Sequence, residues 1–313
     1  MASSTPLRIG TRGSPLALAQ AHEVRDRLVA AHGIDPVTID IVVVEVTGDR
    51  IQDKALRSFG GKGLFTKEIE EALLASRIDL AVHSMKDVPT RHQSGLGLAA
   101  ILEREDPRDA FVSRRFATLA DMPAGTKIGT SSLRRAAQVR KARPDLEVVE
   151  FRGNVQTRMR KLDEGIADAT FLAVAGLNRL DAADTITRAM PPDEMLPAVA
   201  QGAIGVEIRL DDARTRDLLA PLHHHESGMR VTAERAFLAE LDGSCRTPIA
   251  GFAALDAGTM AFHGEVLLLD GSEQHAVEAN APVGDDDAAA KFGTKVGETL
   301  RERAGADFLA QIV

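Results

Sequence analysis

Three short segments combine a strand end, a helix-capping side chain and an arginine: residues 10–14 (GTRGS), 129–135 (GTSSLRR) and 151–154 (FRGN). Serine and asparagine favour the first position of a helix, where unpaired backbone N–H groups and the helix dipole attract anions. A neighbouring arginine adds a bidentate partner for carboxylate or phosphate. One such segment alone is better explained by capping beside a surface arginine, whereas three together predict a polyanion site. The candidate ligands are Arg12, Ser14, Ser132, Arg134, Arg135, Arg152 and Arg158.

Residues 82–89 (VHSMKDVP) form a second group, in which an apolar strand ends in Ser84, Lys86 and Asp87. Among cations, Asp87 would stay ionised and could stabilise a developing positive charge or move a proton. It could equally pair with Lys86 or cap a turn, and the spacing does not distinguish these uses. His83 is interpreted as a packed histidine at the strand end.

The single cysteine, Cys245, lies in the segment 242–248 (DGSCRTP). A lone cysteine is usually a small buried apolar residue. The polar, turn-forming neighbours and the adjacent Arg246 instead favour the thiolate, which attacks electrophiles. No paired histidine and asparagine motif of a thiol protease accompanies it, so a covalent attachment point is as plausible as a nucleophile that turns over.

Two further motifs carry less weight. Residues 58–64 (SFGGKGL) are glycine-rich but lack the spacing of a P-loop, and they predict either a lid carrying Lys62 or a plain flexible loop. The run His223, His224, His225 and Glu226 does not predict a metal site, because consecutive helical side chains point about 100° apart.

The composition bounds the function classes. The chain has 313 residues, of which 44% are hydrophobic and 27% charged, as in ordinary globular proteins. One cysteine can form neither an internal disulfide nor a cysteine-based metal site. There is no export signal and no apolar run long enough for a membrane helix, so we expect a cytoplasmic protein that does not contact a membrane. The absence of Trp, Tyr and any basic tract disfavours a nucleic-acid partner.

Hydrophobic periodicity supplies the elements that position these groups. Short apolar runs alternate with helical patterns over residues 7–200, which is typical of βαβ units around a mostly parallel sheet. The expected strands are 7–10, 39–46, 80–83, 127–129, 147–151 and 169–174. The expected helices are one between Ser14 and Gly33, then 66–76, 132–142, 155–164 and 175–181.

The pattern changes after about residue 225. A helix over 231–241 is followed by strands that include 262–269, a turn at Asp270-Gly271 and a last helix over 287–304. We therefore predict an α/β protein with two α/β lobes and a small α+β C-terminal domain. The predicted domains are 1–105 with 198–220, then 106–197, and finally 221–313.

Taken in order, the motifs resemble those of the hydroxymethylbilane synthase (porphobilinogen deaminase) family. The resemblance covers essentially the whole chain and rests on residues 82–89, 129–135, 152–154, 172–176 with Arg179, 201–203, and 234–249 around Cys245. It implies two type II periplasmic-binding-protein-like lobes and a monomeric transferase of porphyrin, tetrapyrrole and heme biosynthesis. Such enzymes join four porphobilinogens head to tail with loss of ammonia and release linear hydroxymethylbilane by hydrolysis.

The resemblance also implies roles for individual residues. Cys245 would carry a dipyrromethane cofactor through a thioether, and Asp87 would be the catalytic group. Cofactor binding is implied for Ser84, Lys86, Asp87, Ser132, Arg134, Arg135 and Arg152, and substrate binding for Arg12, Ser14, Arg158, Arg179, Gln201, Lys62 and Phe65. This sequence departs from common family residues at Ser58, Ser244 and Arg246. The alternative is a two-lobed binding protein for an anionic ligand, without catalysis.

Overall fold

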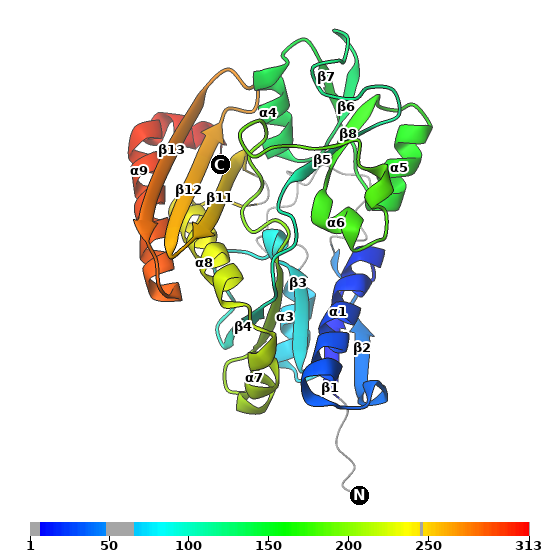
Figure 1. Ribbon diagram of the computed structural model, residues 1–313, viewed down its shortest axis with the longest axis vertical. Helices are drawn as coiled ribbons and strands as arrows, with labels where there is room; N and C mark the ends of the chain where they lie inside the picture. The colour runs from blue at the N-terminus through cyan, green and yellow to red at the C-terminus, as the bar shows by residue number, and fades with distance from the viewer. Residues whose placement is uncertain (1–6, 48–65, 245–246, 313) are drawn as a thin grey trace, which may run out of the picture. The chain divides into compact units, whose positions relative to one another are not determined.

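The computed structural model describes residues 7–47, 66–244 and 247–312, which divide into two compact units (Figure 1). Unit 1 comprises residues 1–104 and 203–228, and unit 2 comprises residues 105–202 and 229–313. The chain therefore passes between the units after residues 104, 202 and 228. The finer division of unit 2 into domains 106–197 and 221–313 stays a prediction.

Unit 1 is built on a five-stranded sheet with the order β2-β1-β3-β10-β4. Its strands are β1 (Leu7–Thr11), β2 (Ile39–Val43), β3 (Leu80–Ser84), β4 (Leu96–Ile101) and β10 (Ile204–Arg209), and its helices are α1 (Pro15–His32), α3 (Lys67–Leu74) and α7 (Ala213–Leu219). Helix α1 begins at Ser14, which caps it, and ends at Gly33 in the left-handed conformation with φ 62°. These are the two ends that the sequence predicted.

Unit 2 contains a second five-stranded sheet with the order β7-β6-β8-β5-β9. Its strands are β5 (Asp109–Ser113), β6 (Lys127–Gly129), β7 (Glu147–Val149), β8 (Ala169–Ala173) and β9 (Arg188–Ala189), and its helices are α4 (Leu133–Ala142), α5 (Val155–Asp163) and α6 (Val174–Asn178). Phe111 and Phe171 pack in one buried cluster, while Phe151 and Leu177 pack in another.

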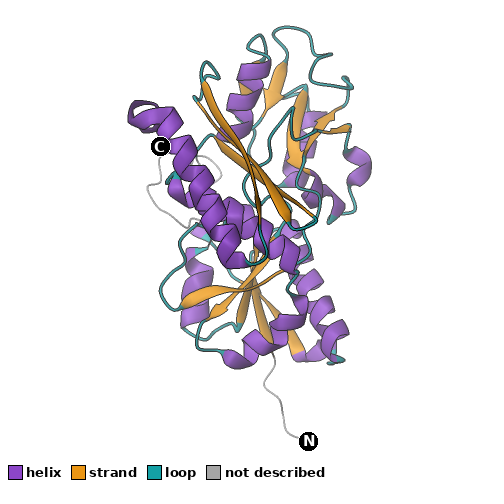
Figure 2. Ribbon diagram, turned by 60° about the vertical axis from the view of Figure 1, so that its left-hand side comes forward, coloured by secondary structure: helices purple, strands orange, loops and turns teal. Residues whose placement is uncertain are grey.

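The remainder of unit 2 is a three-stranded antiparallel sheet, β11-β12-β13, with two helices (Figure 2). It consists of α8 (His225–Glu240), β11 (Ile249–Asp256), β12 (Thr259–Leu267), β13 (Gln274–Pro282) and α9 (Asp286–Ile312). Helix α9 packs on β12 and β13 and bends at Gly305, whose φ is 75°. These elements confirm the predicted fold class, α/β with a small α+β part.

The prediction of mostly parallel sheets is confirmed for strand direction, because only β10 in the first sheet and β5 in the second run against the other four strands. In each five-stranded sheet two neighbouring pairs are parallel and two are antiparallel. Parallel pairing needs a crossover element between neighbours. The chain instead enters β5 and β10 directly after it has passed between the units, so these two strands can run antiparallel. The predicted strands 39–46 and 147–151 end early, at Val43 and Val149. Among the described residues, no helix is long and apolar enough to cross a membrane.

Candidate functional site

Two of the predicted segments meet at one edge of the first sheet. Strands β1 and β3 are parallel neighbours, so Arg12 and Ser14 follow one strand at the same edge where Ser84 and Asp87 follow the other. The Ser14 hydroxyl accepts from the Ala17 N–H at 3.3 Å. The parallel pairing of β1 and β3 thus brings together two motifs that lie about 70 residues apart along the chain.

Gln20, a polar residue within the buried stripe of α1, was not predicted from the sequence. Its side-chain amide donates to Ser84 Oγ at 2.9 Å, and the Ser84 hydroxyl donates back to Gln20 Oε1 at 3.0 Å. Gln20 is buried. A polar side chain on an otherwise apolar face was the signal that could have identified it.

Met85 anchors the Ser84–Asp87 segment through a backbone hydrogen bond and a buried side chain. Residues Met85–Asp87 form one 3₁₀ turn, and the Met85 N–H donates to the Ala203 carbonyl at 3.0 Å. The buried Met85 side chain passes over Gly205 of β10, where a Cβ atom would lie 2.1 Å from Met85 Sδ. A side chain at position 205 would therefore displace the segment that presents Lys86 and Asp87.

The Asp87 carboxylate makes no hydrogen bond or ion pair with any residue that the structure describes, and its side chain is only partly buried. The two structural alternatives, pairing with Lys86 and capping of a turn, both require such a contact. The carboxylate is therefore available for a ligand.

His83 packs in the interior, as the sequence predicted. Its Nε2 lies 3.2 Å from Glu207 Oε2, and His92 Nδ1 lies 2.8 Å from Glu207 Oε1. Burial alone would raise the pKa of Glu207, but the hydrogen bonds and positive charge of the two histidines lower it to about 2. This ion pair joins β3 to β10 directly behind Ser84.

In unit 2, three parallel neighbours bring the other predicted segments to one edge of the second sheet. Ser132 follows β6 and caps α4, Asn154 follows β7 and caps α5, and Arg179 ends α6 after β8. Gly129 allows this approach, because a Cβ atom there would lie 2.5 Å from the Phe151 ring.

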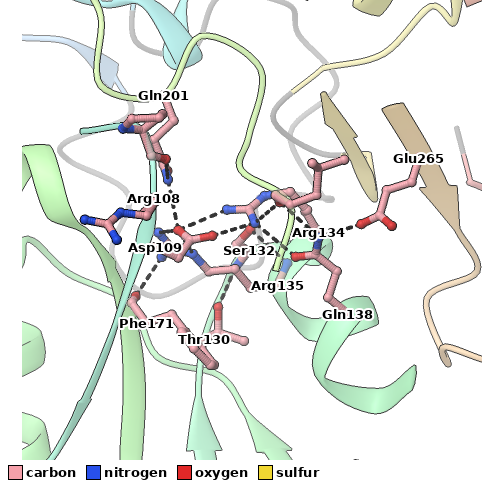
Figure 3. A network of polar contacts seen from close by, with 12 residues as sticks. Arg108, Asp109, Thr130, Ser132, Arg134, Arg135, Gln138, Phe171, Gln201 and Glu265 are labelled. Atoms are coloured by element: carbon pink, nitrogen blue, oxygen red, sulfur yellow. Dashed lines mark hydrogen bonds and ion pairs between the residues drawn. The ribbon is translucent and has the colours of Figure 1, made fainter. Parts of the chain in front are cut away.

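Arg134 and Arg135 do not extend into solvent but share one buried carboxylate, Asp109 at the start of β5 (Figure 3). Arg134 Nη1 lies 2.7 Å from Asp109 Oδ2, and Arg135 Nη2 lies 2.6 Å from Oδ1. Burial alone would raise the pKa of Asp109, but the two guanidinium charges hold it well below its usual range. The sequence predicted both arginines and missed Asp109.

Gln201 and Arg179 connect this cluster to the chain that leaves unit 2. Gln201 is buried, and its Nε2 donates to the Pro107 carbonyl at 2.8 Å and to Asp109 Oδ1 at 3.0 Å (Figure 3). Arg179 Nη1 donates to the Gly202 carbonyl at 3.2 Å.

Arg152 and Arg158 are partly buried at the start of α5. Arg152 Nε donates to Glu150 Oε1 at 2.6 Å, and the Glu150 side chain is 63% exposed. An exposed pair of this kind contributes little stability, so the guanidinium can exchange its partner for a ligand carboxylate at small cost.

Comparison with known proteins identifies the family of this chain. Residues 7–217 match the family model described as "Porphobilinogen deaminase, dipyromethane cofactor binding domain", and residues 229–302 match "Porphobilinogen deaminase, C-terminal domain". The porphobilinogen deaminase of Paracoccus denitrificans (strain Pd 1222) is 59% identical over 303 residues, covering 97% of this chain and 96% of that protein. The chain belongs to the porphobilinogen deaminase family. The predicted transferase class and the dipyrromethane cofactor are thereby confirmed.

Two solved structures are more distantly similar to this chain. A methionine-binding lipoprotein, described as putative, from Bacillus subtilis is 12% identical with a TM-score of 0.43, covering 72% of this chain and 92% of its own. The methionine binding protein MetQ is 11% identical with a TM-score of 0.45, covering 70% and 89%.

The arginine cluster fits a polycarboxylate such as dipyrromethane. Arg134 and Arg135 share the carboxylate of Asp109, and the other buried carboxylate of the network, Glu265, is linked to Arg134 only through Gln138. Arg134 Nε is buried and has no hydrogen-bond partner within the described part of the chain. A buried N–H without a partner is costly, and a ligand carboxylate would satisfy the donor.

Three predicted residues, Cys245, Lys62 and Phe65, lie outside the described residues. The residues on either side of 245–246 are joined by two hydrogen bonds. The Ser244 N–H donates to Thr247 Oγ1 at 2.9 Å, and the Thr247 hydroxyl donates to the Ser244 carbonyl at 2.7 Å. Within the described ranges, no three His, Cys, Asp or Glu side chains are grouped to hold a metal ion.

Proposed function

We propose that this chain condenses four porphobilinogens head to tail onto a dipyrromethane held by Cys245 through a thioether, then releases linear hydroxymethylbilane by hydrolysis. When bound, the cofactor supplies the pyrrole carbon to which the first substrate is joined. The observation that carries the proposal is the cationic edge of the second sheet, where two arginines share one carboxylate in a chain of this family.

The arginines would bind the acetate and propionate groups that every pyrrole unit carries. We assign cofactor contacts to Ser132, Arg134, Arg135 and Arg152, with Ser84, Lys86 and Asp87 contributing from unit 1. Substrate contacts are assigned to Arg12, Ser14, Arg158, Arg179 and Gln201, and to Lys62 and Phe65. Among these residues, the assignment of Arg152 as a ligand contact has the clearest structural support. Its present partner is an exposed glutamate, which a ligand carboxylate can replace.

Asp87 would perform the chemistry of each addition. In each addition the aminomethyl C–N bond of porphobilinogen breaks, ammonia leaves with the electron pair, and a C–C bond forms at a pyrrole carbon that then loses its proton. A carboxylate that has no partner among the described residues can stabilise the positive charge left by ammonia and accept or return these protons.

A binding protein for an anionic ligand would use the same arginines but would need neither an unengaged Asp87 nor a cysteine, so the synthase is the better account. A cytoplasmic location, a monomeric state and the absence of a metal stay predictions.

Replacing Arg152 by leucine is expected to raise KM for porphobilinogen about tenfold to a hundredfold, the value of one charge-assisted hydrogen bond. The fraction of chains that carry the cofactor, measured by intact mass, should fall as well. Arg160→Leu is the matched control on α5, the helix that follows Arg152, since its side chain is 69% exposed and pairs with Glu164 across one turn. Equal KM and equal loading in both variants would remove Arg152 from the site. Wild-type protein that consumes no porphobilinogen would contradict the proposed function itself.

A further inference from the structure

A strained backbone lies where the chain leaves unit 2. In the described part of the chain, five non-glycine residues have positive φ, and four of them, Ser76, Asp181, Asp242 and Ala257, are exposed. Ala200 alone among them is buried, with φ 58° and an exposed fraction of 1%. Left-handed backbone is sterically unfavourable for a buried alanine and persists where the surrounding structure enforces it.

Glu234 of α8 holds the backbone of Ala200 in this conformation. Its side chain is fully buried, and Oε2 accepts from the Ala200 N–H at 2.6 Å while Oε1 accepts from the Ala253 N–H of β11 at 2.8 Å. One carboxylate therefore joins α8, the segment around Ala200 and the C-terminal sheet. The Pro197 carbonyl adds a second link, because it accepts from the Gly251 N–H at 3.2 Å.

The conformation at Ala200 sets the position of Gln201, the next residue. The Gln201 amide reaches Pro107 and Asp109, and Asp109 in turn holds Arg134 and Arg135. Gly202 allows this close approach of the two chain segments, since a Cβ atom there would lie 2.4 Å from the Glu105 carbonyl oxygen. Glu234 is thus linked to the arginine pair by hydrogen bonds at Ala200 and Gln201 and by the peptide bond between these two residues.

We propose that Glu234 is a positioning residue, which holds Ala200 in its left-handed conformation and thereby fixes Gln201, Asp109 and the two arginines in the geometry that binds pyrrole carboxylates. The inference rests on the proposed function. It assigns Glu234 no contact with substrate or cofactor, because its carboxylate is occupied by backbone N–H groups.

The test is Glu234→Gln in the full-length holoenzyme. The amide keeps one acceptor oxygen but loses the other, so it can hold only one of the two N–H groups. We expect KM for porphobilinogen to rise about tenfold while kcat changes less than about threefold, the signature of lost ground-state binding. The fraction of chains that carry the cofactor, read from intact mass, should fall in parallel. A merely structural role would reduce the yield of folded protein without changing KM.

Ala200→Gly provides the rescue, because glycine adopts positive φ without steric cost. Combined with Glu234→Gln it should return KM to within about twofold of the wild-type value. Ala257→Gly is the matched control: Ala257 has φ 44° but is exposed in the turn between β11 and β12, and its replacement should restore nothing.

An unchanged KM in Glu234→Gln, or rescue by Ala257→Gly equal to that by Ala200→Gly, would overturn the proposal. If Glu234→Gln alone does not fold, the double variant with Ala200→Gly decides, and its failure to fold or to bind substrate normally also overturns the proposal. Failure of the proposed function is distinguishable, since the wild-type protein itself would then not turn over porphobilinogen.

Discussion

Replacing Asp87 by alanine is expected to lower kcat about a thousandfold, within the range of rate enhancement that a positioned acid or base provides. The carboxylate would act on substrate twice in each addition, first on the positive charge left by ammonia and then on the ring proton. Because it has no hydrogen bond or ion pair with any described residue, its removal should leave the fold and the thermal unfolding temperature nearly unchanged. Steady-state turnover of porphobilinogen measures the loss.

Two comparisons make the Asp87 result specific. Asp87→Ala should still carry the cofactor by intact mass, which separates loss of chemistry from loss of loading. Asp26→Ala is the control on the surface of α1, where the Asp26 side chain is 65% exposed beside Arg25, and it should retain wild-type turnover. Near-normal activity in Asp87→Ala would remove this carboxylate from its central role.

Asp109→Asn is expected to lower the free energy of unfolding by about 3–5 kcal/mol, the cost of leaving buried charges without their partner. The carboxylate is fully buried and neutralises one of the two guanidinium charges of Arg134 and Arg135. Denaturant unfolding monitored by circular dichroism measures the change. Binding should weaken as well, since the two arginines would lose the group that orients them.

The matched control for Asp109 is Asp163→Asn in the same unit. Asp163 pairs with Arg114, and the two side chains are 56% and 49% exposed. Loss of such an exposed pair should cost less than about 1 kcal/mol. A similar, small loss in both variants would show that the Asp109 cluster does not hold the arginines in place.

Local sequence signals predicted the parts of the site that depend on neighbours in the chain. Ser14, Ser132 and Asn154 cap helices because their side chains bond to N–H groups three residues ahead, and this preference is visible in the sequence. The same logic located Ser84 and Asp87 at the end of a buried strand.

The parts that the sequence did not predict depend on partners far away in the chain. Asp109 precedes Arg134 by 25 residues, and nothing in its neighbourhood indicates that two arginines will neutralise it. Gln20 is polar on an apolar face and meets Ser84 64 residues later. Antiparallel β5 and β10 arise from passage of the chain between units, which no local pattern encodes. Nothing in the sequence around Ala200 indicates a left-handed backbone, because the carboxylate that holds it belongs to Glu234, 34 residues further along the chain.

The most direct test of the central claim is the intact mass of the native protein beside that of Cys245→Ala. If Cys245 carries the cofactor, the wild-type mass exceeds the sum of the residues by two linked pyrrole units, and Cys245→Ala has the unmodified mass and no turnover. An unmodified mass in wild-type protein that turns over porphobilinogen would contradict covalent attachment at this cysteine.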